Sequence, residues 1–208
     1  MPTPSPKTQL IVWGGLVLVV AAVLAASLLS SPPRKPLPVY SEIPDFSLSN
    51  QEGRMTSLAD WRGHIVLADL IFSRCPGQCL LLDATMKKIQ DSLPSSPSVQ
   101  LISLTCDPVY DTPAVLKKYG QDHGARSEVW SFLTGPKEML RHLAFDGMKL
   151  SIADKNAADR QTPDDLFTHS TRLVLIDAHG KIRGWFDGST TDSIPSIFAA
   201  IQTLALEK

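Results

Sequence analysis

The sequence has no surplus of positive charge. Its 208 residues include 20 lysines and arginines against 21 aspartates and glutamates, a formal net charge of −1. A chain without a basic stripe lacks the long-range field that holds a phosphate backbone, so we expect no nucleic-acid partner.

No internal repeat is visible. The length fits one globular domain with a short appendage.

The N-terminal segment has little charge. Residues 1–9 form a short tail with one lysine and no arginine, unlike a mitochondrial transit peptide. Residues 10–30 follow as an apolar run, and its first 20 or so residues would span roughly 30 Å as a helix. Because a signal peptide has a shorter apolar stretch of about 7–15 residues, we expect one transmembrane anchor. The charges flanking this run barely decide its orientation.

Residues 31–42 are rich in proline, which predicts a stiff, extended linker. Residues 43–208 then form the expected folded domain, which opens with a β-hairpin over residues 44–58. Strands are predicted at 65–72, 99–105 and 128–133, helices at 80–93, 113–123 and 136–143, a hairpin at 172–186 and a last helix around 197–204. This order predicts an α/β fold of the thioredoxin-like type, extended by the N-terminal hairpin and preceded by the anchor.

Cys75 and Cys79 directly follow the first buried strand, at the start of a predicted helix. Four residues apart in helical geometry, their Cα atoms lie roughly 6 Å apart, within reach of a disulfide or a shared metal ion. The helix N-terminus favours thiolate over thiol, which promotes nucleophilic attack and metal ligation alike. Two inert buried cysteines, or a stabilising disulfide, are the other interpretation.

Cysteine is too scarce for a closed zinc site, because the pair supplies two of the four thiolate or imidazole ligands that zinc takes. Two thiolates and one imidazole suit copper, whose reduced form accepts soft, low-coordinate surroundings. His169 is the best placed of five histidines, in a polar segment that we expect to be a loop folding back over the cysteines. A lone histidine is more often a surface residue than a ligand.

Four ordered segments between Ile43 and the C-terminus resemble the Sco/SenC family. They are the strand end with its Cys-x3-Cys motif (residues 71–79), the stretch 103–119, residues 130–135, and Thr168-His169-Ser170 before the strand 173–177. The resemblance implies a thioredoxin-like fold and copper bound by Cys75, Cys79 and His169. It also implies delivery of copper to the copper-containing subunit of cytochrome c oxidase, with Cys75 and Cys79 as the redox-active pair of any secondary reductase activity.

The sequence departs from the family pattern in two places. The motif loop carries Gly77 and Gln78 where many members have aspartate, and Leu80 stands where proline is common. Cys106 is an extra thiol, either a small buried hydrophobe or an auxiliary sulfur near the site. Because the tail is unlike a mitochondrial transit peptide, we expect the anchor to lie in a bacterial inner membrane. The cysteine chemistry then places the domain in the periplasm, where we expect thiol reductants to keep the cysteines reduced.

Three other functions remain open. A thiol:disulfide oxidoreductase is the main alternative, since Asp69, six residues before Cys75, resembles the buried carboxylate of thioredoxins. Thioredoxins, however, use Cys-x2-Cys and a cis-proline that this chain lacks at residues 168–170. A peroxidase is disfavoured by the absence of a Pro-x3-Thr-x2-Cys signature. A copper sensor or redox switch would use the same ligands as a metallochaperone.

Overall fold

The computed structural model describes residues 6–29, 35–75, 77–93 and 98–207. They belong to two units, Met1–Lys35 and Pro36–Lys208. Part of the predicted tail (residues 1–5) and of the predicted linker (residues 31–34) lies outside the described residues. The first unit contains helix α1 (Pro6–Leu29), over the residues for which the sequence predicts an anchor. Among the described residues, no helix reaches both the length and the apolar character that crossing a membrane requires.

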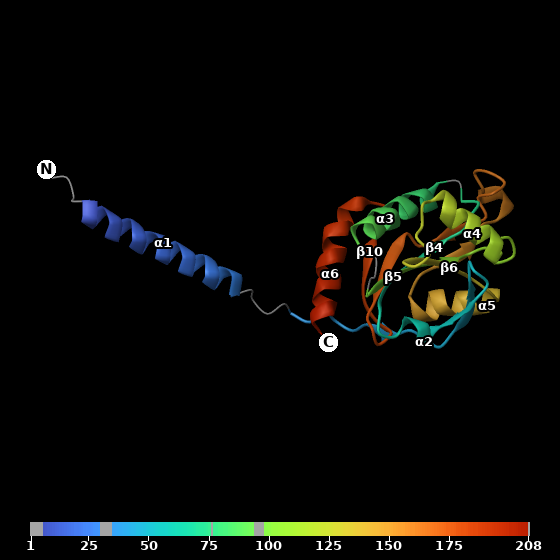
Figure 1. Ribbon diagram of the computed structural model, residues 1–208. Coiled ribbons are helices and arrows are strands. Elements are labelled where there is room, and N and C mark those ends of the chain that lie inside the picture. Colours follow the sequence, from blue (N-terminus) through green and yellow to red (C-terminus); the bar gives the residue numbers. More distant parts are fainter. Residues whose placement is uncertain (1–5, 30–34, 76, 94–97, 208) are drawn as a thin grey trace. The chain divides into compact units, whose positions relative to one another are not determined.

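The second unit is built on an eight-stranded mixed sheet in the order β1-β10-β9-β4-β5-β6-β2-β3 (Figure 1). The strands are β1 (Ser41–Glu42), β2 (Ser47–Asn50), β3 (Met55–Ser57), β4 (Ile65–Ile71), β5 (Val99–Thr105), β6 (Trp130–Thr134), β9 (Arg172–Ile176) and β10 (Lys181–Asp187). The helices are α2 (Leu58–Trp61), α3 (Gln78–Ser92), α4 (Pro113–Asp122), α5 (Lys137–Arg141) and α6 (Ile194–Leu206), with shorter turns η1 (His142–Gly147), η2 (Ala157–Asp159) and η3 (Thr191–Ser193).

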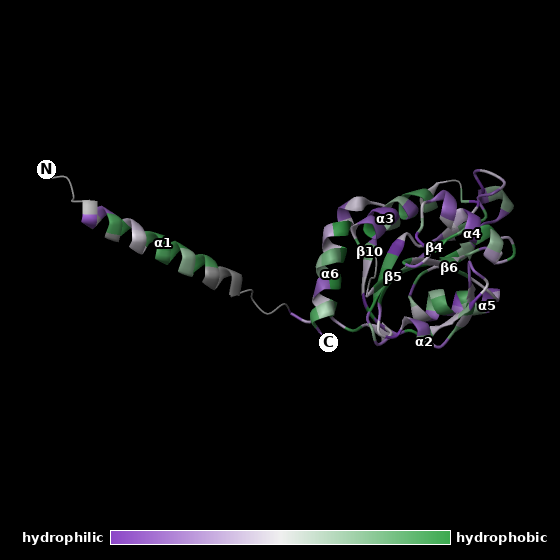
Figure 2. Ribbon diagram, in the orientation of Figure 1, coloured by the Kyte–Doolittle hydropathy of each residue, from purple (hydrophilic) through white to green (hydrophobic). Residues whose placement is uncertain are grey.

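The predicted alternation of strands and helices is confirmed at the centre of the sheet. Strands β4, β5 and β6 are parallel, with Ile65 opposite Val99 and Ile71 opposite Thr105. Every residue of β4 is buried because layers cover both faces. Figure 1 shows α3 and α4 on one side of the sheet and α2 and α5 on the other, and Figure 2 shows hydrophobic residues along much of β5. The core therefore lies around these three strands.

Helix α4 shows how local sequence sets an element's ends. The Thr112 side chain accepts a hydrogen bond from the backbone N–H of Val115, and Pro113 occupies the first helical position. Gly124 follows the helix with a φ of +67°, a conformation that glycine adopts without steric cost. The start at Thr112-Pro113 and the end at Gly124 are confirmed as predicted from the sequence.

Both predicted hairpins are present. β2 pairs with β3, and β9 pairs with β10, in antiparallel register. The main sheet has one strand that the sequence did not predict: β1 pairs with β10 through Ser41 opposite Ile182, inside the segment that the sequence assigns to the linker. Extended backbone has unpaired N–H and C=O groups and readily joins a sheet edge. The last residues of the predicted linker therefore belong to the sheet.

The prediction that His169 lies on a loop is wrong. His169 ends strand β8 (Phe167–His169), which pairs with β7 (Ile152–Asp154) in a separate two-stranded sheet, called here the ribbon. The paired residues of β7 and β8 lie 13 to 17 positions apart in sequence, and each strand has only three residues, too few for an alternation pattern to be visible. The histidine is thus held by a backbone ladder.

Candidate metal centre

The site lies where β4 gives way to α3. After Ile71 the chain makes a tight turn in which the Cys75 N–H donates to the Phe72 carbonyl at 3.0 Å. Helix α3 then begins at Gln78, two residues earlier than the sequence predicts, so that Cys79 lies in its first turn. Free backbone N–H groups at such a helix start favour a negative charge on nearby sulfur.

The two sulfurs have different surroundings. Cys79 is 1% exposed, whereas Cys75 is half-buried, and both are free thiols. The backbone N–H of Cys79 donates to the Cys75 Sγ at 3.4 Å. The two cysteines therefore lie close together beyond the end of β4, with the Cys75 sulfur accessible and the Cys79 sulfur enclosed.

His169 reaches the sulfur pair from the opposite side. Its Nε2 lies 3.2 Å from the Cys79 Sγ, and its ring is 5% exposed. Its Nδ1 lies 3.0 Å from the Ser170 carbonyl oxygen, which can only accept a hydrogen bond, so Nδ1 carries the proton. The Phe72 ring packs edge-on against the imidazole at 5.8 Å. The lone pair of Nε2 is thereby directed at the sulfurs.

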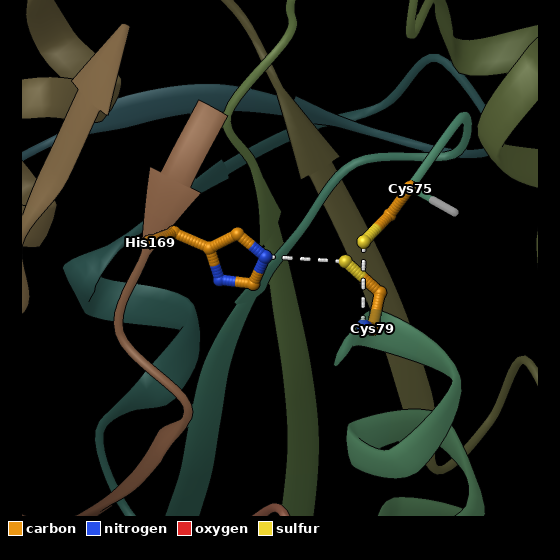
Figure 3. A group of neighbouring side chains, drawn as sticks. All are labelled: Cys75, Cys79 and His169. Carbon is orange, nitrogen blue, oxygen red and sulfur yellow. Dashed lines mark hydrogen bonds between the residues drawn. The ribbon is translucent and has the colours of Figure 1, made fainter. Parts of the chain in front are cut away.

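These three side chains form one donor set (Figure 3). The ligand atoms of Cys75, Cys79 and His169 all lie within 4.8 Å of one another, and no other group of three or more such side chains was found among the described residues. Two sulfurs and an imidazole nitrogen are soft to borderline ligands, which fit Cu(I) better than oxygen-seeking cations such as Mg²⁺ or Ca²⁺. The structure therefore brings together the residues that the sequence singled out, with a chemistry that suits copper.

The two thiols differ in acidity. The Cys79 thiol donates a hydrogen bond that stabilises the Cys75 thiolate and, helped by two backbone N–H groups, lowers the pKa of Cys75 to about 4 against the cost of burial. The same hydrogen bond, together with burial, raises the pKa of Cys79 far above that of a free thiol. At neutral pH, Cys75 is the thiolate and Cys79 keeps its proton.

The alkylation rate of Cys75 should accordingly be nearly independent of pH. Because its pKa is about 4, the thiolate fraction changes little between pH 6 and 8, whereas an ordinary thiol of pKa about 8.5 gains roughly 100-fold in thiolate over that range. Mass spectrometry after timed iodoacetamide treatment of the metal-free protein measures this. A tenfold rise per pH unit in the native protein would contradict the assignment, and Cys79→Ala should make the profile steeper.

A cavity of about 360 Å³ opens onto the donor set. It is lined by Cys75 and His169, by residues of the segment that joins β7 to β8, including Lys155 and Asp165, and by Phe167 of β8. Cys79 is not among the lining residues. An incoming ligand would therefore meet Cys75 and His169 first.

Arg74 is a neighbour of the site that sequence reasoning did not single out. Its guanidinium donates to Asp107 at 2.7 Å and to Asp164 at 3.4 Å, and it lies 4.2 Å above the Tyr110 ring. These partners lie 33 to 90 residues away in sequence. Only the position of Arg74, directly before Cys75, was a signal that could have found it.

Two acids are buried behind the site. Asp69 of β4 is fully buried, and burial raises its pKa to about 8. Asp83, one helical turn after Cys79, accepts a short hydrogen bond from the Tyr119 hydroxyl, and burial raises its pKa to about 6. Asp69 was noticed in the sequence, but Asp83 was not. Both are candidates for influencing the electrostatics of the cysteine pair.

Cys106 lies apart from the donor set. It is 4% exposed at the end of β5, where its N–H donates to the Ile71 carbonyl at 2.7 Å. Burial raises the pKa of its thiol, which disfavours a thiolate ligand. This favours the interpretation as a small buried hydrophobe over that of an auxiliary sulfur.

Comparisons with known proteins agree with this geometry. A family model described as SCO1/SenC matches residues 35–206. The SCO1 protein homolog of Bacillus subtilis is 26% identical over 173 residues, which cover 82% of this chain and 86% of that protein.

Solved structures share the fold. That of BsSco, described as a member of the Sco family of cytochrome c oxidase assembly proteins, has 28% identity and a TM-score of 0.67, covering 82% of this chain and 99% of that one. The structure of Arabidopsis thaliana ScoI with copper bound has 20% identity and a TM-score of 0.63, covering 78% and 99%. The predicted α/β fold is thereby confirmed as that of these proteins.

Proposed function

Because this chain belongs to the SCO1/SenC family, we propose that it is a copper metallochaperone that delivers copper to the copper-containing subunit of cytochrome c oxidase during assembly of the enzyme. The observation that carries the proposal is the donor set: Cys75, Cys79 and His169 lie within 4.8 Å of one another. BsSco, a solved relative, is described as a cytochrome c oxidase assembly protein. On this proposal the main role of the protein is that of a carrier, with any thiol:disulfide reductase activity secondary.

The donor set suits a carrier that must release its cargo. Three ligands leave a copper ion with room for one more, so that a partner's thiolate can bind before a ligand of the carrier leaves. The cavity of about 360 Å³ gives such a ligand access from the side of Cys75 and His169. Exchange through a shared coordination sphere avoids free copper ions.

Transfer of copper tests the proposal directly. The reduced full-length protein, loaded with one equivalent of copper, should pass it to the metal-free copper-binding domain of the oxidase subunit even when a competing copper chelator is present. Separation of the two proteins and metal analysis of each measures the outcome. Cys106→Ala should transfer as the wild type does, because Cys106 lies outside the donor set.

Two results would contradict delivery. Copper that stays on the chain in the presence of the oxidase domain would indicate a sensor, which holds its metal and signals by docking. Copper that reaches the domain only through the chelator would indicate passive release. A chain that binds no copper would remove the proposal altogether.

A thiol:disulfide oxidoreductase is the second candidate. The observation that favours it is the half-buried Cys75, whose pKa of about 4 makes it a thiolate with Cys79 directly behind it. Such a pair can attack a disulfide and resolve the mixed disulfide through the second thiol. BsSco is described as having a disulfide switch. Reduction of an unfolded disulfide substrate by the metal-free protein tests this activity.

We also propose that the protein is a single-pass protein of a bacterial inner membrane, with the second unit in the periplasm and served there by thiol reductants. The apolar run at residues 10–29 supports this. Protease treatment of spheroplasts, which degrades only what faces the periplasm, together with extraction of membranes by alkali, tests the placement.

A further inference from the structure

The two halves of the donor set come from separate parts of the fold. Cys75 and Cys79 belong to the junction between β4 and α3, whereas His169 belongs to the ribbon. Within the described residues, the side-chain interactions between these parts are few. They are the Cys79–His169 contact, the edge-on packing of Phe72 against Phe167 and His169, and the ion pair of Arg74 with Asp164.

Arg74 is anchored firmly on one side. Its 2.7 Å ion pair joins it to Asp107, whose side chain is only 9% exposed. The Asp107 backbone is itself fixed at the end of β5, because its N–H donates to the Thr105 hydroxyl at 2.9 Å. A charge-assisted hydrogen bond to a nearly buried carboxylate is stronger than an exposed one. The Tyr110 ring below the guanidinium adds a cation–π contact.

On its other side Arg74 reaches toward the ribbon. Its second terminal nitrogen lies 3.4 Å from Asp164, whose side chain is 56% exposed and which lies in the segment joining β7 to β8, five residues before His169. A planar guanidinium can hold two carboxylates in a fixed relation, which a lysine ammonium cannot. Arg74 is also the residue next to Cys75, so the same side chain is tied to both halves of the donor set.

We propose that Arg74 is a positioning residue that clamps the ribbon to the cysteine turn and so sets how long copper is retained. The inference rests on the proposed copper binding. It assigns no contact between Arg74 and the metal; the residue acts through the relative placement of Cys75 and His169. The ordinary loss from removing such a supporting group is about 10- to 100-fold in metal affinity.

The test compares two arginines. Arg74→Ala in the full-length protein should lose copper to a chelator about tenfold faster than the wild type. The matched control is Arg141→Ala, because Arg141 also forms a 2.7 Å ion pair with the ribbon, to Asp154, but, among the residues that the structure describes, makes no hydrogen bond or ion pair with the cysteine turn. Arg74→Lys should resemble Arg74→Ala, since a lysine keeps the positive charge but lacks the planar guanidinium that holds two carboxylates at once. Urea unfolding of each variant separates loosening of the site from loss of the fold.

A second measurement needs no metal. In the metal-free protein, Arg74→Ala should accelerate alkylation of Cys79, which is 1% exposed when the ribbon is in place. Wild-type rates of both copper loss and Cys79 alkylation in Arg74→Ala would overturn the clamp. So would full recovery in Arg74→Lys, or an equal effect of Arg141→Ala. Failure of the wild type to bind copper would remove the proposed function, and Cys79 alkylation would still decide whether Arg74 holds the ribbon.

Discussion

Replacing His169, Cys75 or Cys79 by alanine is expected to lower copper affinity by about 10²- to 10³-fold each. Sites of four ligands hold zinc with about 10–16 kcal/mol, or about 3–4 kcal/mol per ligand, and a tenfold change in affinity is about 1.4 kcal/mol. The donor atoms lie within 4.8 Å of one another, close enough for all three to bind one ion. Titration of the reduced protein against a competing copper chelator measures the loss.

Matched controls are available for both residue types. Cys106→Ala removes a buried thiol outside the donor set, and His142→Ala removes a histidine whose partner is Asp146. Both should bind copper as the wild type does. Equal affinity of His169→Ala and the wild type would show that the imidazole is not a ligand. If His169→Ala loses copper but still reduces disulfides, the carrier and reductase activities are separable.

Asp69→Asn is expected to change how stability depends on pH. Ser103 lies opposite Asp69 on β5, and its hydroxyl accepts the Trp130 indole N–H. That hydroxyl keeps its own O–H and only partly offsets the cost of burying the Asp69 carboxylate, whose oxygens have no hydrogen bond of normal geometry within the described residues. Burial raises the pKa of Asp69 to about 8 from its usual 3.8. Between those values the folded state keeps a proton that the unfolded state has lost, so its stabilising contribution is complete below pH 4 and is lost as the pH rises toward 8.

The expected size of this pH effect on the free energy of unfolding follows from the same proton linkage. Each pH unit costs about 1.4 kcal/mol, so Asp69 lowers the free energy of unfolding by about 3 kcal/mol between pH 5 and pH 7. Asp69→Asn has no titrating proton and should lack this part of the decline. Urea unfolding at both pH values measures it, with Asp122→Asn, an exposed carboxylate paired with Lys118, as the control. Parallel declines in wild type and Asp69→Asn would show that Asp69 is ionised in the folded protein.

The central sheet was predictable because its signals are local. The apolar run of β4 and the helix start at Thr112-Pro113 each depend on residues adjacent in sequence. The cysteine pair was visible for the same reason, since four residues separate the two thiols. Local pattern therefore located the strand-to-helix junction and the sulfur half of the site.

The position of His169, which supplies the imidazole half of the donor set, depends on pairing between strands that are separated in sequence. Among five histidines, residue patterns gave only a preference for His169, and the resemblance to a family strengthened it. The ladder between β7 and β8 that holds His169 joins segments whose three-residue strands carry no readable period. The partners of Arg74 are also distant in sequence, at 33 and 90 residues. A single sequence does not encode such contacts in any local pattern.

If the protein delivers copper as proposed, the unequal exposure of the two sulfurs would give the transfer a direction. Cys75 borders the cavity, whereas Cys79 is 1% exposed and does not. In such a transfer a partner's thiolate would approach from the side of the cavity, the first bond to break would be that to Cys75 or His169, and the bond to Cys79 would break last. Copper would leave through the same cavity by which it enters. The enclosed Cys79 sulfur would keep the ion bound until the partner's ligand has formed its own bond to it.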